Sequence, residues 1–156
     1  MECLFSGSPW TSLDGNWSLF CTGEECEQSV QDVQIQAKIP GDLLSDLKAA
    51  GIIEEPLFER NFKTMSRFWT KGNWTYLKHL SPSQDEKKML ASLVFDGIKM
   101  GAVIRVDGVI VEKATDQFLR YVIPIASSSS IVAVSFEQNM DEKGRFMACS
   151  GGWVRV

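Results

Sequence analysis

Residues 33–39 read Val-Gln-Ile-Gln-Ala-Lys-Ile, and this alternation of apolar and polar side chains decides the fold class. Successive side chains of a strand point to opposite faces, so the alternation predicts a strand with one buried face. Pro40 and Gly41 end the strand, and Asp42 is a favourable N-cap residue. Apolar residues at helical spacing follow, and Gly51 stands where a helix-terminating glycine belongs. The stretch therefore predicts a strand followed by one short helix near residues 43–50.

Strand-like patterns recur along the rest of the chain. They occupy residues 16–20, 74–80, 89–95, 102–106, 109–112, 118–125 and 131–136. Residues 89–95 are apolar on both alternating faces, which predicts a central strand packed on two sides. Asp107-Gly108 suits the two positive φ angles of a type I′ turn and predicts a hairpin. Eight short strands separated by turn signals predict an all-β fold, an antiparallel β-sandwich.

Two segments lack this alternating, strand-like pattern. Residues 56–68 have little periodicity but carry large apolar side chains, among them Leu57 and Phe58. We expect this segment to form a long loop packed against the end of the sandwich. Residues 82–88 are charged and short, and we expect a solvated hairpin loop there.

Charge and composition exclude several classes of protein. The 156 residues include 16 basic and 20 acidic side chains, a net charge of −4, which argues against a non-specific nucleic-acid binder. No run of 18 apolar residues is present, so we expect no membrane span. The first residues lack the basic and apolar regions of a secretory signal, and we expect a cytoplasmic protein.

Little about function follows from the cysteines, the single histidine and two short motifs. Cys21 and Cys26 are not in a Cys-x-x-Cys motif, and His79 is the only histidine of the chain, so we expect no metal site and reduced, partly buried thiols. Asn16 and Asn73 each begin an Asn-x-Ser/Thr sequon, but this motif is common by chance and is weak evidence for glycosylation.

No catalytic constellation and no cofactor motif stands out. His79 lies in a predicted strand without a neighbouring nucleophile, which is typical of a surface or packing residue. The glutamate pairs at 24–25 and 54–55 are adjacent, and neighbours on a strand point to opposite faces, so neither pair makes a catalytic dyad. Trp153 follows a glycine-rich stretch, and it either stacks on a sugar ring or packs beneath its own loop.

Five segments, taken in order, resemble a known family. They are Leu-Asp-Gly-Asn-Trp-Ser-Leu at 13–19, Ile-Pro-Gly-Asp-Leu-Leu at 39–44, Ala-Gly-Ile-Ile at 50–53, Trp-Thr-Tyr at 74–76 and Phe-Asp-Gly-Ile at 95–98. Their order and spacing resemble the N-terminal sugar-binding domain of glycoside hydrolase family two, in its β-mannosidase-like branch. The resemblance covers nearly the whole chain.

The resemblance implies a jelly-roll, galactose-binding-like β-sandwich. In the family this domain precedes immunoglobulin-like domains and a (β/α)₈ barrel that carries the two catalytic glutamates. We therefore expect a non-catalytic domain whose parent enzyme hydrolyses O-glycosyl bonds and whose downstream domains and β-linked sugar substrate are its partners. The alternative is a free-standing carbohydrate-binding or protein-interaction module of the same fold.

The end of the chain departs from the family pattern. Ser150-Gly151-Gly152-Trp153 resembles the approach to a Trp-Asp-Trp motif whose loop enters the active site, which makes Trp153 the candidate carbohydrate-binding residue. Val154 and Arg155 stand where the Asp and the second Trp would be. We therefore expect residues 1–156 to form a single, C-terminally incomplete domain with an open, poorly ordered end at residues 137–156.

Overall fold

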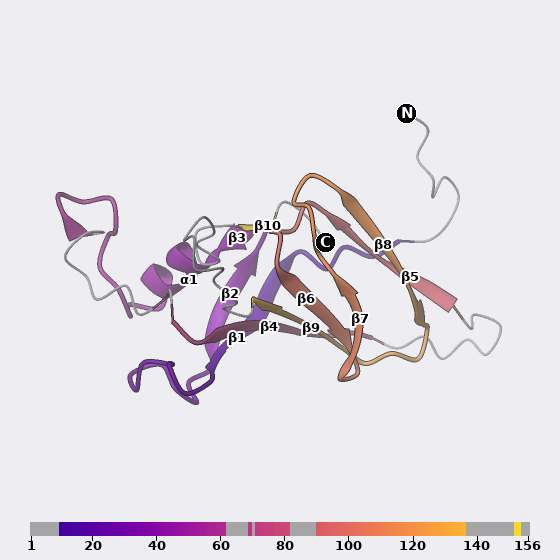
Figure 1. Cartoon of the computed structure of the whole chain (residues 1–156), viewed down its shortest axis with the longest axis horizontal. Coiled ribbons are helices and arrows are strands. Elements are labelled where there is room, and N and C mark those ends of the chain that lie inside the picture. Colours follow the sequence, from indigo (N-terminus) through magenta and orange to yellow (C-terminus); the bar gives the residue numbers. More distant parts are fainter. Residues whose placement is uncertain (1–9, 62–68, 70, 82–89, 137–151, 154–156) are drawn as a thin grey trace.

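A six-stranded antiparallel sheet in the order β2-β1-β4-β9-β6-β7 forms the larger layer of the fold (Figure 1). The computed structural model describes residues 10–61, 69, 71–81, 90–136 and 152–153. The strands of the larger sheet are β1 (Gly15–Thr22), β2 (Ile35–Ile39), β4 (Asn73–His79), β6 (Ala102–Val106), β7 (Val109–Lys113) and β9 (Ile131–Phe136). Neighbouring strands in this sheet all pair antiparallel.

Three smaller parts complete the described fold. Strand β5 (Leu90–Asp96) pairs with β8 (Arg120–Ala126) in a two-stranded sheet, and β3 (Gly41–Asp42) pairs with β10 (Gly152–Trp153). Helix α1 (Leu43–Ala49) contacts β2 and β3 at one end of the fold, and the β5–β8 pair lies at the other end (Figure 1). These elements confirm the predicted all-β sandwich with one short helix.

The core lies on one face of the larger sheet. Alternate residues of its strands are buried there: Trp17, Leu19, Ile35, Ala37, Trp74, Tyr76, Ile104, Val132 and Val134. Leu43 and Leu47 of α1 cover part of this face, and side chains of β5 and β8 join the same apolar cluster. The Tyr76 and Phe136 rings pack edge to face with centroids 5.9 Å apart, a favourable aromatic geometry.

Helix α1 begins and ends where the sequence predicts. Asp42 has extended backbone angles, and its side chain accepts a hydrogen bond from the Ser45 backbone N–H. Ala50 is the C-cap, and Gly51 follows with a φ of 70°, a left-handed conformation that glycine adopts without a steric cost. The cap residues therefore set both ends of this short helix.

The turn at Asp107-Gly108 connects β6 to β7 and also contacts β9. Asp107 has a φ of 48° and Gly108 a φ of 84°, which confirms the predicted pair of positive angles. The Asp107 carboxylate accepts hydrogen bonds from the backbone N–H groups of Ser130 and Ile131 at 3.0 and 2.9 Å. These bonds hold the pKa of Asp107 below its usual range and join the hairpin to the start of β9.

Two predictions about the sandwich were wrong. Strand β5 is buried on one face only: Leu93 and Phe95 are buried, whereas on the other face Ser92 is exposed and Val94 is half-buried. The reason is that, within the described residues, β5 belongs to an outer two-stranded layer and meets the core from one side. Leu57 and the neighbouring Phe58 are exposed rather than packed against the sandwich.

Several other expectations concern residues outside the described ranges. The remainder of the 56–68 loop beyond residue 61, the 82–88 loop and the expected open end at 137–156, apart from residues 152–153, all fall there. Of the described residues, no helix combines the length and the apolar character needed to cross a membrane.

Candidate functional site

The turn from β2 into β3 creates a short strand that holds β10. After β2 ends at Ile39, a cis peptide bond precedes Pro40 and Gly41 begins β3. A Cβ at Gly41 would lie 2.2 Å from the Lys38 carbonyl oxygen, so only glycine fits this turn. In the β3–β10 pair, Gly41 faces Trp153 and Asp42 faces Gly152. The sequence-predicted sugar contact, Trp153, thus stands beside the turn that leads into α1.

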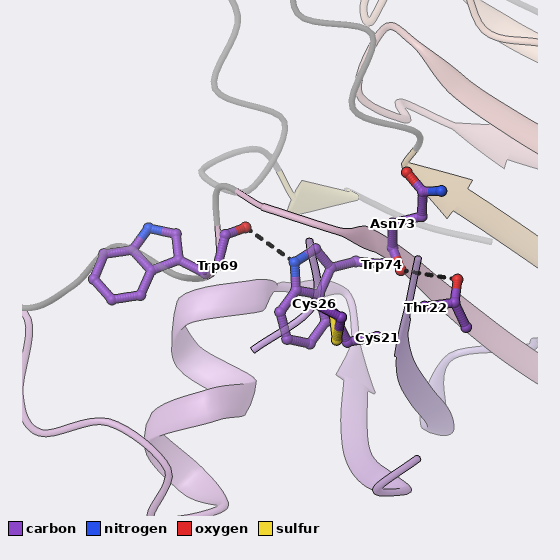
Figure 2. Close-up of a disulfide and its surroundings, with 6 residues drawn as sticks. All are labelled: Cys21, Thr22, Cys26, Trp69, Asn73 and Trp74. Atoms are coloured by element: carbon purple, nitrogen blue, oxygen red, sulfur yellow. Dashed lines mark hydrogen bonds between the residues drawn. A yellow bond between two sulfur atoms is a disulfide. The ribbon is translucent and has the colours of Figure 1, made fainter. Parts of the chain in front are cut away.

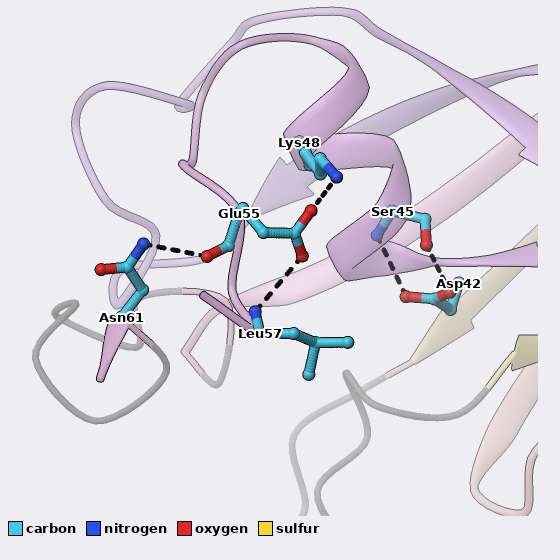
Figure 3. A network of polar contacts seen from close by, with 6 residues as sticks. All are labelled: Asp42, Ser45, Lys48, Glu55, Leu57 and Asn61. Atoms are coloured by element: carbon cyan, nitrogen blue, oxygen red, sulfur yellow. Dashed lines mark hydrogen bonds and ion pairs between the residues drawn. The ribbon is translucent and has the colours of Figure 1, made fainter. Parts of the chain in front are cut away.

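A polar network fixes α1 next to this strand pair (Figure 3). The Asp42 carboxylate accepts from the Ser45 N–H at 3.1 Å and from the Ser45 hydroxyl at 2.7 Å. At the other end of the helix, Lys48 forms an ion pair with Glu55, and the Leu57 N–H donates to the same carboxylate at 3.3 Å. The hydrogen bond from Lys48 lowers the pKa of Glu55. These contacts link the start of α1 to Asp42 of β3 and the end of α1 to the turn that follows the helix.

Asp46 connects α1 to the larger sheet from inside the core. Its side chain is 4% exposed, and its carboxylate accepts from the Lys38 N–H at 2.9 Å and from the Tyr76 hydroxyl at 3.4 Å. Burial raises the pKa of Asp46 from 3.8 to about 6, against the opposing effect of these two hydrogen bonds. Burial and the adjacent Asp46 also raise the pKa of Tyr76. Asp46 is shielded from solvent and therefore acts as a structural anchor rather than a group that meets a substrate.

A disulfide closes the loop that follows β1. Cys21 and Cys26 are bonded, with Cα atoms 6.0 Å apart, which is within the ordinary range for a disulfide. Figure 2 shows it beside Trp74, whose indole N–H donates to the Trp69 carbonyl at 3.0 Å. The expectation of reduced thiols is therefore wrong for this pair. Gly23, at a φ of 99°, lies between the two cysteines in this loop.

A shallow hollow of about 670 Å³ lies on the outer face of β2, β1 and β4. Its lining residues are Asn16, Trp17, Ser18, Gln34, Gln36, Leu77, Lys78 and His79. The Gln34 amide donates to the Ser18 hydroxyl at 2.8 Å, and the Lys78 ammonium donates to the Asn16 carbonyl at 2.8 Å. No Asp or Glu lines this hollow, so it lacks the pair of carboxyl groups that a glycosidase uses. Sequence reasoning did not find it, because its residues come together only through the pairing of three strands.

The remaining sequence candidates are not brought together. His79 is exposed at the hollow, and the glutamates at 24–25 are exposed in the disulfide loop, far along the chain from the pair at 54–55 next to α1. Among the described residues, no three His, Cys, Asp or Glu side chains gather in a way that could hold a metal ion. The Trp153 strand and the outer-face hollow are thus the two features that remain as candidate binding sites.

Most of this chain matches a known protein family and several curated relatives. The family model described as glycosyl hydrolase 2 galactose-binding domain-like matches residues 19–153. A probable β-mannosidase of Caenorhabditis elegans is 28% identical over 133 residues, and the β-mannosidase of Capra hircus is 29% identical over 131 residues. These matches cover 83% and 81% of this chain but 14% of each relative, so the chain spans about one seventh of their length.

Solved structures agree on the fold. The β-D-mannosidase of Dictyoglomus thermophilum superposes with a TM-score of 0.68 at 21% identity, covering 83% of this chain and 16% of that protein. The exo-chitosanase of Amycolatopsis orientalis superposes with a TM-score of 0.61 at 14% identity, covering 80% of this chain and 16% of that protein. At these identities, the likeness establishes the sandwich fold alone.

Proposed function

The chain belongs to the family of glycosyl hydrolase 2 galactose-binding domain-like proteins, and we propose that it serves as the non-catalytic N-terminal domain of a β-mannosidase-like glycosidase. In this proposal, residues 1–156 belong to one sugar-binding-type domain. Its partners are the immunoglobulin-like and barrel domains of the same enzyme, and the substrate is a β-linked sugar.

The pairing of β10 with β3 is the observation that carries this function. The pairing holds Trp153 at a defined place, next to a turn that Gly41 makes possible and that α1 anchors through Asp42. The indole of a tryptophan can stack on the apolar face of a sugar ring. Trp153 is therefore the residue that we assign to sugar contact.

The described carboxylates support a non-catalytic role. A retaining glycosidase needs two carboxyl groups about 5–5.5 Å apart on either side of the scissile bond. Here Asp46 is buried against Lys38 and Tyr76, and Glu55 is engaged by Lys48. Neither faces the outer hollow, which has no carboxylate in its lining. We assign the hydrolytic step to the downstream domains.

The first test is hydrolysis of aryl β-mannosides by the 156-residue chain alone. We expect no turnover above a buffer control, and turnover that persists through purification would overturn the non-catalytic role. Calorimetry with mannose is expected to give binding no tighter than millimolar, because one stacking face without convergent polar groups makes a poor pocket. Micromolar affinity would instead favour the free-standing carbohydrate-binding module.

The second test uses the full-length enzyme with Trp153→Ala and a matched Trp10→Ala variant. Trp10 is 80% exposed at the other end of the chain and serves as the control for loss of an indole. We expect Trp153→Ala to lower kcat/KM for an aryl β-mannoside by about tenfold, which corresponds to about 1.4 kcal/mol of transition-state stabilisation, with Trp10→Ala unchanged. Equal kinetics for the two variants would remove Trp153 from the site.

A further inference from the structure

We infer that Asp46 is the positioning residue for the backbone of Trp153, because it fixes the segment of chain that carries β3 to the larger sheet. Trp153 pairs with Gly41 of β3, so β10 lies where β3 places it. Asp46 acts on this strand pair through Lys38 and the turn that follows it. Its effect on hydrolysis rests on the proposed function, whereas its effect on the position of β10 does not.

A hydrogen bond between residues eight apart in the sequence closes a ring of chain around β3. The Lys38 N–H donates to Asp46 Oδ1 at 2.9 Å, and β3 lies between these two residues. Within the same ring, the Asp42 carboxylate accepts from the N–H and the hydroxyl of Ser45 (Figure 3). Strand β3 can therefore move away from β2 only if the bond to Asp46 breaks or the turn changes its shape.

The turn inside this ring has little room to change its shape. A Cβ at Gly41 would lie 2.2 Å from the Lys38 carbonyl oxygen, so the Gly41 backbone packs directly against that carbonyl. Lys38 also pairs with Asn16 of β1, at the β2 edge of the larger sheet. Strand pairing, the contact with Gly41 and the bond to Asp46 thus fix Lys38 from three directions. Of these three contacts, the one to Asp46 links the turn to α1.

Asp46 is also fixed to the middle of the larger sheet. Its second oxygen accepts from the hydroxyl of Tyr76 at 3.4 Å, and both side chains are buried. Tyr76 belongs to β4, which lies between β1 and β9. An apolar residue at position 46 would leave the Lys38 N–H and the Tyr76 hydroxyl without this acceptor, and a buried donor without an acceptor costs free energy. The cost is relieved when α1 and β3 move off the sheet, which displaces β10.

The positioning is tested in the 156-residue chain by NMR, from the hydrogen exchange of the Gly152 and Trp153 amides at about pH 5. Asp46, with a pKa of about 6, is mostly protonated there, so Asp46→Asn is a close neutral match that keeps an oxygen for the Lys38 N–H. Asp46→Ala removes the acceptor but keeps a good helix former. The control for a general loss of stability is Ile104→Ala, on β6 in the other half of the sheet.

We expect the protected β10 amides to exchange about tenfold faster in Asp46→Ala than in the wild type, because local opening of α1 and β3 exposes them. In Asp46→Asn and in Ile104→Ala we expect exchange within about threefold of the wild type. Wild-type exchange in Asp46→Ala, or equal acceleration in Asp46→Ala and either of the other variants, would overturn the inference. Unprotected Gly152 and Trp153 amides in the wild type would overturn it as well.

A second measurement decides the question if Asp46→Ala does not fold. It compares the wild type with Asp46→Asn between about pH 5 and pH 7.5. The groups that act on the Asp46 carboxyl are the Lys38 N–H of β2, the Tyr76 hydroxyl of β4 and the Asp42 carboxylate of β3, and none of them is a cation. Ionisation of Asp46 therefore favours opening. We expect the ratio of wild-type to Asp46→Asn protection at β10 to fall about tenfold as the pH rises, and a constant ratio would overturn the inference.

The effect on hydrolysis is tested by a double-mutant cycle in the full-length enzyme. We expect Asp46→Ala to lower kcat/KM for an aryl β-mannoside by about fivefold, and by less than about twofold in a chain that already carries Trp153→Ala. Equal losses in the two backgrounds would show that Asp46 does not act through Trp153. Wild-type kinetics of Trp153→Ala alone would instead refute the proposed sugar contact, and the exchange rates would still decide whether Asp46 positions β10.

Discussion

The larger sheet and the β5–β8 pair each bury one face, but they differ in the contacts that hold them in place. The larger sheet buries nearly all the large apolar side chains of its inner face, with α1 covering one end. The smaller sheet buries Leu93, Phe95 and Ile123 on its inner face, whereas Val122 on the outer face of β8 is 46% exposed and the preceding loop leaves Phe118 87% exposed. That loop is instead held by Tyr121, whose hydroxyl accepts from the backbone N–H groups of Thr115 and Asp116 at 3.0 and 2.9 Å.

The contrast locates the stability of the domain. Burial of apolar surface contributes most where the side chains leave water completely, so the larger sheet carries most of the free energy of folding. The smaller sheet closes one end of the core with Leu93, Phe95 and Ile123. The loop that precedes β8 is held by hydrogen bonds to the Tyr121 hydroxyl. Substitutions in the two layers are therefore expected to differ in cost.

The largest difference is expected between Ile104→Ala and Val122→Ala. Ile104 is fully buried on β6, so its truncation leaves a cavity and is expected to cost about 2–5 kcal/mol. The side chain of Val122 is half-exposed, and its truncation to alanine is expected to lower the free energy of unfolding by less than about 1 kcal/mol. Urea unfolding of the two variants measures both values, and similar costs would show that the smaller sheet is as tightly packed as the larger one.

The buried carboxyl of Asp46 is expected to make the α1 end of the larger sheet pH-sensitive. Its folded pKa, about 6, lies above the ordinary 3.8, so the folded chain holds this proton more tightly than the unfolded chain does. The stability from the neutral carboxyl is present below about pH 4 and is lost as the pH rises through about 6, a change of about 3 kcal/mol.

Asp46→Asn provides the test of this pH dependence. The amide oxygen can still accept the Lys38 N–H, but the side chain no longer ionises. We expect the stability of the variant, relative to the wild type, to increase between about pH 4 and pH 7 and to level off above. Taking the difference cancels the titration of the carboxylates shared by both chains. Parallel stability curves over this range would contradict a raised pKa at Asp46.

A smaller effect is expected at the glycine beside the disulfide. A Cβ at Gly72 would lie 2.8 Å from the Cys21 sulfur and 3.2 Å from Thr22 O, whereas a Cβ at Gly101 would meet nothing within 4 Å. Both glycines have positive φ angles, so Gly101→Ala is the control for backbone strain alone. We expect Gly72→Ala to cost about 1–3 kcal/mol more than Gly101→Ala, by the same unfolding assay. Equal costs would mean that the disulfide loop shifts to accommodate the added methyl group without a further loss of stability.

The smallest effect is expected at the N-cap of α1. Asp42→Ala removes both hydrogen bonds to Ser45 and is expected to cost about 0.5–2 kcal/mol. Asp42→Ser retains a capping hydroxyl and is expected to recover most of that loss. If the Ser and Ala variants unfold at the same urea concentration, packing rather than capping sets the start of the helix.

Local signals predicted much of this fold. The alternation predicted the buried face of β2 over residues 35–39, although Val33 lies before the strand and is 42% exposed. Asp42 and Gly51 bounded the helix, because caps and periodicity act over a few neighbouring residues. Asp107-Gly108 likewise predicted its turn, although the bonds from Ser130 and Ile131 to the Asp107 carboxylate depend on β9. Sequence reasoning succeeded wherever the deciding contacts are local.

Non-local contacts account for what was missed. The two-sided prediction for β5 failed because strand order decides which layer a strand joins, and the exposure of Leu57 depends on what is available to cover it. The Cys21–Cys26 bond depends on a loop geometry that spacing alone does not reveal. For the candidate site, the sequence pointed to Trp153 but not to Gly41 as its strand partner, nor to the hollow beside Asn16.

The placement of β9 between β4 and β6 has a consequence for how the chain folds. Thr75 and Ser135 face each other across β4 and β9 although 60 residues separate them, and β9 also pairs with β6. Before residues 131–136 are made, the larger sheet exists only as two halves, β2-β1-β4 and the β6-β7 hairpin. Long-range pairing of this kind carries a high loop-closure cost and is typical of domains that fold in milliseconds to seconds. One late strand therefore sets the moment at which the two halves become a single sheet.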